Sequence, residues 1–153
     1  MKIIVSDAGL LIGLAKIGYL YLLEEIFDEV LIPRAVCDEL KLSDNRPGSK
    51  LLNRAINYDK WIKVHKVDTL NSKLMLILDR GETEAIILAK KRGLLVLIDK
   101  IRGRKAAKKE GLDIIGTGRI IIAAKQKGLI PNVSDILNEL NLYDSPLSVK
   151  IFA

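Results

Sequence analysis

Three acidic side chains stand where an α/β sheet would bring them together. Asp7 follows the apolar run Met1–Ser6, Asp99 follows the apolar run Leu94–Ile98, and Glu82 opens the helix expected before that second run. Parallel strands place their carboxyl ends on one edge of the sheet, where the next helix begins. Carboxylates gathered there repel one another, and a divalent cation relieves that repulsion. The spacing therefore predicts a metal site.

The two strand-end aspartates also have structural explanations. Asp7 could cap a helix that begins near Ala8, a role worth roughly 1 kcal/mol. Asp99 could be a turn aspartate before Lys100, since aspartate is frequent where strands end. A functional role is favoured for Asp7, because ligands of open α/β sheets bind directly after the central strands.

The helix expected over Arg80–Arg92 carries two further acids. Asp79 and Glu82 have the spacing of a capping box, in which the glutamate returns to the cap backbone. Glu82 shares its helical face with small apolar residues and is expected to point toward the sheet. Glu84 lies about 200° around the helix and is expected to pair with Lys91 or to face solvent.

The order of expected elements predicts a single α/β domain. With 153 residues, 49% of them hydrophobic, the chain can bury one substantial core. Short apolar strands alternate with helices, the pattern of a parallel sheet covered on both faces. We expect strands over 2–5, 30–32, 61–64, 94–98 and 112–115, and helices over 10–17, 19–27, 34–42, 49–57, 80–92, 102–110, 117–127 and 133–141. The strand over 61–64 is expected at the edge of the sheet, and Pro33 is expected to be the first residue of its helix.

Charge favours a polyanionic partner. Lys and Arg number 25 against 19 Asp and Glu, giving a net charge of +6. A solvated lysine-rich surface is an equal alternative from charge alone. The run Lys100–Lys109 nevertheless places its cations directly after Asp99, beside the acidic edge.

The remaining sequence features indicate a cytoplasmic protein. Ser6, Asp7 and Lys16 interrupt the apolar N-terminal stretch, and no signal-peptide cleavage site follows. The single cysteine, Cys37, cannot form an internal disulfide. The tail, residues 143–153, carries apolar side chains and is expected to dock on its own domain, with a second copy of the chain as the alternative.

Five blocks of the sequence resemble the PIN-domain superfamily, most closely its DUF3368-type branch. The resemblance runs from about Lys2 to Ser148, and the blocks occur in the family's order and spacing. It implies a three-layer α/β/α sandwich around a central parallel sheet. It also implies a metal-dependent ribonuclease of the kind found as the toxin of toxin–antitoxin pairs, with RNA as substrate, an antitoxin as partner and a possible homodimer. The blocks are VSDAGLLIGLAKIG, VLIPRAVCDEL, LDRGETEAIILAKKRG, LLVLIDKIRGRKAA and GLDIIGTGRIIIAAKQKGLIP.

The resemblance assigns four catalytic acids, which are Asp7, Glu39, Glu82 and Asp99. Sequence reasoning alone cannot choose Glu39 over Asp38. Of the four, Asp7, Glu82 and Asp99 are implied as ligands of Mg²⁺ or Mn²⁺, which would activate a water and neutralise charge on the scissile phosphate. Two hydroxyls are expected to support them: Ser6 by orienting the Asp7 carboxylate, and Thr117 as a neutral oxygen at the same edge.

One departure from the family pattern supports a competing function. Many PIN nucleases carry a further acid shortly after the fourth one, whereas this chain continues from Asp99 with cations. Four of these are expected to contact nucleic acid, namely Lys100, Arg102, Arg104 and Lys105. The thinner acidic shell suits one metal ion rather than two, and it makes a non-catalytic RNA- or protein-binding module the alternative function.

Two other chemistries are set aside. A phosphatase of the haloacid-dehalogenase type would need a second aspartate two residues after Asp7, where this chain has Gly9. Covalent catalysis lacks a well-placed nucleophile, and His65, between Lys63 and Lys66, is expected to be exposed on an edge strand rather than catalytic.

Overall fold

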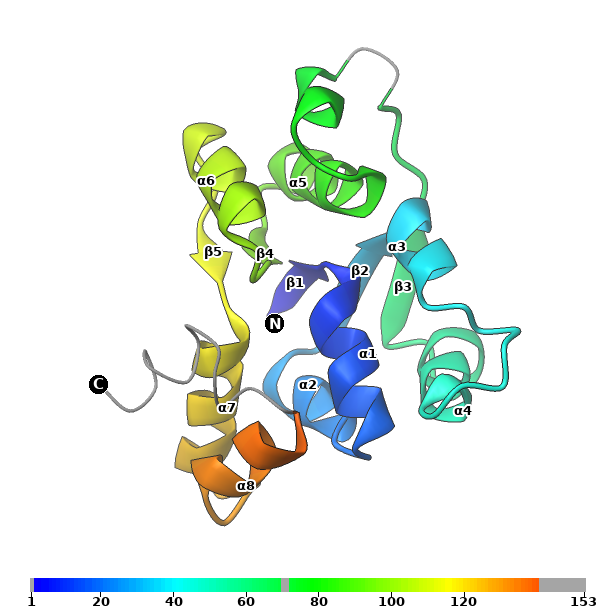
Figure 1. Cartoon of the computed structure of the whole chain (residues 1–153), viewed down its shortest axis with the longest axis vertical. Coiled ribbons are helices and arrows are strands. Elements are labelled where there is room, and N and C mark those ends of the chain that lie inside the picture. Colours follow the sequence, from blue (N-terminus) through cyan, green and yellow to red (C-terminus); the bar gives the residue numbers. More distant parts are fainter. Residues whose placement is uncertain (1, 70–71, 141–153) are drawn as a thin grey trace.

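The computed structural model describes residues 2–69 and 72–140 and contains one five-stranded parallel sheet (Figure 1). The strands lie in the order β3-β2-β1-β4-β5, and every neighbouring pair is parallel. Their bounds are β1 Ile3–Ser6, β2 Glu29–Pro33, β3 Ile62–His65, β4 Leu95–Leu97 and β5 Ile114–Ile115. The strand expected at the edge is indeed the outer strand β3.

The centre of the sheet determines where the acids can lie. Strand β1 pairs with β2 on one side and β4 on the other, with Ser6 opposite Leu97. The pairing extends one residue further, since the Asp7 amide donates to the Leu97 carbonyl at 3.1 Å. Asp7 and Asp99 therefore follow adjacent strands that end at the same edge.

Helices cover both faces of this sheet, giving three layers. Alternate side chains of β1 divide between two cores: Val5 packs with α5 and α6, and Ile4 with α1, α2, α7 and α8. Figure 1 shows these two sets of helices on opposite sides of the strands. The bounds are α1 Ala8–Lys16, α2 Tyr21–Ile26, α3 Arg34–Glu39, α4 Ser49–Asn53, α5 Arg80–Arg92, α6 Ile101–Lys109, α7 Thr117–Gln126 and α8 Val133–Glu139.

The elements occur where the sequence predicted them, although the helix expected over 34–42 ends three residues early, at Glu39. Four further differences are local. Pro33 is the extended last residue of β2 and caps α3, because its ring fixes φ but leaves ψ free to be 164°. The helix expected over 49–57 divides into α4 and a π-helical turn η1, Arg54–Tyr58. A short 3₁₀ helix η2, Lys73–Leu76, was not predicted. Strand β5 is two residues shorter, since the Leu112 amide instead closes the end of α6 on Ala107.

One prediction lies outside the described residues, and another is addressed only within them. The tail over 143–153 lies beyond the described residues, so its docking stays a prediction. Within residues 2–69 and 72–140, no helix has the length and apolar character needed to span a membrane.

Candidate functional site at the carboxyl edge of the sheet

Asp7 stands at the centre of the edge, between the sheet and the first turn of α1. Its Oδ1 accepts a hydrogen bond from the Ala8 amide at 2.9 Å, so the capping role considered from the sequence is real. Burial raises the pKa of Asp7 despite that bond, and the nearby carboxylates of Asp79 and Asp99 raise it further, while Lys100 lowers it. The capping bond to Ala8 therefore does not explain why Asp7 is partly buried near two other carboxylates.

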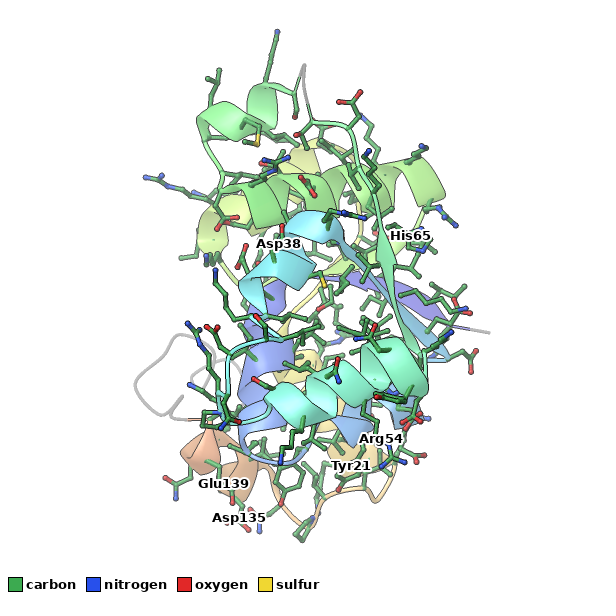
Figure 2. All side chains as sticks on the ribbon, turned by 90° about the vertical axis from the view of Figure 1, so that its right-hand side faces the viewer. Tyr21, Asp38, Arg54, His65, Asp135 and Glu139 are labelled. Atoms are coloured by element: carbon green, nitrogen blue, oxygen red, sulfur yellow. The ribbon has the colours of Figure 1, made fainter. Side chains whose placement is uncertain are left out.

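Glu39 reaches Asp7 from the last turn of α3. A Cβ atom placed on Gly81 would collide with Glu39 Oε1 and lie 3.6 Å from Asp7 Oδ1, so the glycine separates the two carboxylates. Burial raises the pKa of Glu39, and the charges of Asp7 and Asp79 raise it further. The neighbouring Asp38 lies on the face of the molecule shown in Figure 2. The structure thus places the Glu39 carboxylate near Asp7, although Asp38 and Glu39 are both exposed, and the catalytic role of Glu39 stays a prediction.

Glu82 is the most deeply buried acid of the group, with 5% of its surface exposed. Its Oε1 lies 3.7 Å from Lys100 Nζ, and its buried Oε2 has no hydrogen-bond partner. Gly103 in α6 leaves it space, since a Cβ atom there would be 2.6 Å from Oε2. Burial, followed by a carboxyl hydrogen bond and charge repulsion with Asp79, raises the pKa of Glu82 to about 7.

Asp79 joins this group and was missed as a site residue by the sequence reasoning, which gave it only a capping role. Its Oδ1 accepts from the Glu82 amide at 2.8 Å, and its Oδ2 accepts from Lys100 Nζ at 3.2 Å. Burial acts to raise the pKa of Asp79, but hydrogen bonds from Glu82 and Lys100 outweigh it and lower the pKa. The spacing of three residues between Asp79 and Glu82 was the available signal, because it places both side chains at the same end of α5.

Asp99 lies at the same edge but is engaged by the start of α7. Its carboxylate accepts from the Thr117 amide at 2.8 Å and also from the Thr117 hydroxyl. Thr117 is therefore at the edge where the sequence placed it, as a donor to Asp99. Gly116 keeps the approach open, because a Cβ atom there would be 3.1 Å from Asp99 Oδ1.

Two predicted contacts are wrong in detail. The Ser6 hydroxyl donates to the main-chain oxygen of Asp7 at 2.8 Å and does not orient its carboxylate. Glu84 does not face solvent or pair with Lys91: it is 2% exposed, and it accepts from the Ala35 amide at 3.1 Å and from Arg80 Nε at 2.9 Å. Glu84 lies on the side of α5 that faces α3. The helical periodicity of the sequence does not predict where α3 packs.

The predicted nucleic-acid contacts all lie on or beside α6. Lys100 Nζ is already engaged by the carboxylates of Asp79 and Glu82. Although burial lowers the pKa of Lys100, the hydrogen bond to Asp79 and the surrounding carboxylates raise it overall. Arg102 and Lys105 are exposed, and Arg104 is half-buried near Gly116, where a Cβ atom would be 3.5 Å from its Nη1.

The acids do not surround a ready-made metal site. Among the described residues, no three His, Cys, Asp or Glu side chains are grouped so that they could hold a metal ion. The oxygen donors are nonetheless the type that Mg²⁺ and Mn²⁺ bind, and Glu82 Oε2 is buried without a partner. The donor chemistry fits a divalent ion, whereas in this structure the cation in contact with Asp79 and Glu82 is the Lys100 ammonium.

The histidine is remote from this group. His65 ends strand β3, where its Nδ1 lies 3.2 Å from Arg92 Nη2 (Figure 2). Burial and the Arg92 charge lower its pKa. Its partner and its position give it no contact with the acids at the carboxyl edge.

Comparisons with known proteins agree with this architecture. A family model described as PIN domain, DUF3368, matches residues 3–151. Among solved structures, a PilT N-terminus domain protein from the hyperthermophilic archaeon Sulfolobus solfataricus P2 superposes with a TM-score of 0.58 at 18% identity, covering 80% of this chain and 92% of that one. The search of curated proteins gave no match. The resemblance and the α/β/α fold predicted from the sequence are confirmed.

Proposed function

This chain belongs to the DUF3368 family of PIN domains, and on that premise we propose that it is a divalent-metal-dependent endoribonuclease. The family is typically one of nucleases. The observation that carries the proposal is the buried Glu82 carboxylate, whose Oε2 has no partner and whose neighbours are further acids. A purely structural core does not need a carboxylate in that position, because burying one costs free energy unless it is paired.

Three residues would hold the ion in this proposal, namely Asp7, Glu82 and Asp99, with Glu39 as the fourth acid of the reaction. When bound, Mg²⁺ or Mn²⁺ lowers the pKa of a coordinated water and stabilises charge on a phosphate. Asp79 orients Glu82 through the start of α5, and Thr117 fixes Asp99. Both hydrogen bonds are formed by the protein alone and do not require the ion.

RNA is the proposed substrate, since a net charge of +6 and a basic helix beside the acids suit a polyanion. Arg102, Arg104 and Lys105 would bind phosphates and hold the strand over the edge of the sheet. A role as the toxin of a toxin–antitoxin pair in the cytoplasm, with a cognate antitoxin and a possible homodimer, extends the same proposal from the family.

A second candidate function is a non-catalytic RNA- or protein-binding module. The observation that favours it is the cation after Asp99: Lys100 lies where many PIN nucleases have a further acid, and its ammonium contacts Asp79 and Glu82. Such a module would bind RNA through its basic surface without hydrolysing it.

The deciding experiment measures cleavage of single-stranded RNAs with Mg²⁺, with Mn²⁺ and with a chelator. We expect slow metal-dependent cleavage, abolished by Asp7→Asn, because this change removes a ligand charge while asparagine still caps α1. Asp38→Asn is the matched control on an exposed aspartate and should cleave like wild type. RNA binding without metal-dependent cleavage, unaffected by Asp7→Asn, would favour the binding module instead.

A further inference from the structure

Lys100 reaches the acidic group from the loop between β4 and α6. Its Nζ lies 3.2 Å from Asp79 Oδ2 and 3.7 Å from Glu82 Oε1. Its charge also acts on Asp7 and Glu39, two acids that it does not contact directly. One ammonium therefore interacts electrostatically with four carboxyl groups from three different elements.

The contacts of Lys100 leave one buried oxygen of the acidic group without a hydrogen-bond donor. Glu82 is 5% exposed, and its Oε2 has no hydrogen-bond partner. A buried carboxylate oxygen without a donor carries a desolvation cost that a further cation would relieve. The unpartnered oxygen is an observation separate from the lysine contacts, and it fits a cationic ligand at this edge.

We propose that Lys100 is an internal counter-cation that competes with the divalent ion, so that Mg²⁺ or Mn²⁺ must displace its ammonium from Asp79 and Glu82 in order to bind. The proposal rests on the proposed function only in requiring that a divalent ion binds at this edge. It does not depend on whether the bound protein cleaves RNA.

The Lys100 side chain can move from the acids into solvent. It is 65% exposed, and it carries a flexible four-carbon stem with a strongly hydrated ammonium, so release into water has a low cost. Once released, the ammonium would remain beside Arg102 at the start of α6. Displacement by metal would therefore add a free cation to the surface proposed to bind RNA phosphates.

The first test measures the Mn²⁺ affinity of the full chain by isothermal titration calorimetry. Lys100→Met removes the charge but keeps a flexible side chain, and we expect Mn²⁺ to bind at least about tenfold more tightly. Lys100→Arg should stay close to wild type. Lys108→Met, on an exposed residue of the same helix, should remain within about twofold. Equal Mn²⁺ affinity of Lys100→Met and wild type, or no Mn²⁺ binding by any variant, would overturn the proposal.

The second test needs no substitution. Amine labelling followed by mass spectrometry reports how accessible each lysine is in wild-type protein. Adding Mg²⁺ should raise the labelling rate of Lys100 severalfold and leave that of Lys108 unchanged; an unchanged or lower rate at Lys100 would overturn the proposal.

The two proposals can fail separately. Tighter Mn²⁺ binding by Lys100→Met together with no RNA cleavage by any variant would support the counter-cation and reject the nuclease. Metal-dependent RNA cleavage, together with equal Mn²⁺ affinities of Lys100→Met and wild type, would support the nuclease and reject the counter-cation.

Discussion

Glu82 shows how burial and neighbouring charge act on one side chain. Its carboxyl group is enclosed by α5, α6 and the sheet, and Gly103 provides the space that it occupies. Burial raises the pKa of Glu82 to about 7, and a hydrogen bond and charge repulsion with Asp79 act in the same direction. A proton and the Lys100 ammonium together balance acids that a divalent ion would otherwise balance.

The raised pKa of Glu82 predicts an unusual pH dependence of stability. Its pKa rises from 4.5 to about 7 on folding, so between these values the folded state binds more protons than the unfolded state. The free energy of unfolding should therefore fall as pH rises from about 4.5 to about 7, by on the order of 1–3 kcal/mol from this residue. Glu82→Gln should remove most of that fall in urea melts with a chelator present, whereas Glu24→Gln, on the exposed face of α2, should keep it. An identical fall in Glu82→Gln would assign the proton to another group.

Gly81 is a second residue whose effect depends on its surroundings rather than on helix propensity. Replacing a helical glycine by alanine ordinarily stabilises a protein by roughly 1 kcal/mol. At Gly81 the new methyl would collide with the Glu39 carboxylate, so we expect Gly81→Ala to be destabilising and to weaken Mn²⁺ binding.

Gly9 provides the matched control, since it is also the second residue of its helix and its Cβ would meet nothing within 4 Å. Gly9→Ala should stabilise the protein in the same denaturant melts. Equal stabilisation by both substitutions would show that the Glu39 carboxylate moves away from Gly81 without cost and that its position there is not fixed.

At the scale of elements, α5 connects the acids with the helix that carries Glu39. The buried Glu84 carboxylate accepts from the Ala35 amide in the first turn of α3, while Arg80 covers its other oxygen. A side chain of one helix thus satisfies a backbone donor that the start of another helix leaves free. Helix α3 and helix α5 are thereby held in the orientation that brings Glu39 toward Asp7.

Removing this connection should be costly. Glu84→Ala leaves the Ala35 amide without an acceptor, and we expect it to lower the free energy of unfolding by about 2 kcal/mol in denaturant melts. Glu84→Gln keeps an acceptor and should cost less than Glu84→Ala. Arg80→Ala should cost under about 1 kcal/mol, because the Arg80 side chain is 69% exposed and its ion pair is screened. Similar losses for Glu84→Ala and Arg80→Ala would contradict a role for the Ala35 contact.

The same elements show what could be predicted from the sequence. The bounds of α5 and the common edge of Asp7 and Asp99 depend on local periodicity and on the direction of parallel strands, which the chain displays directly. The roles of Glu84 and Lys100 depend on how α3, α5 and α6 approach one another in space. Such contacts between elements leave no periodic signal, and neither does the bond from the Ser6 hydroxyl to the Asp7 main-chain oxygen.

At the scale of the whole molecule, an acidic group at the carboxyl edge of the sheet lies beside the basic helix α6. The acids of the site, Asp7, Glu39, Asp79, Glu82 and Asp99, lie at this edge, while the arginines and lysines of α6 stand beside it on a chain of net charge +6. The cations of α6 would attract a polyanion and bring its backbone to the acids, where a divalent ion would offset the repulsion between carboxylate and phosphate.

Binding of RNA should therefore depend on which cations are removed and not only on how many. Arg102→Ala combined with Arg104→Ala should weaken binding of a single-stranded RNA and reduce the slope of log affinity against log salt by roughly 1.4, since each lost phosphate contact contributes about 0.7. Lys16→Ala combined with Lys127→Ala removes the same charge from exposed sites at the far ends of α1 and α7, and should leave the slope nearly unchanged. Fluorescence anisotropy titrations at several salt concentrations give both slopes. Equal changes of slope in the two double variants would mean that RNA binding responds to net charge alone. The basic face of α6 would then not be the RNA-binding surface.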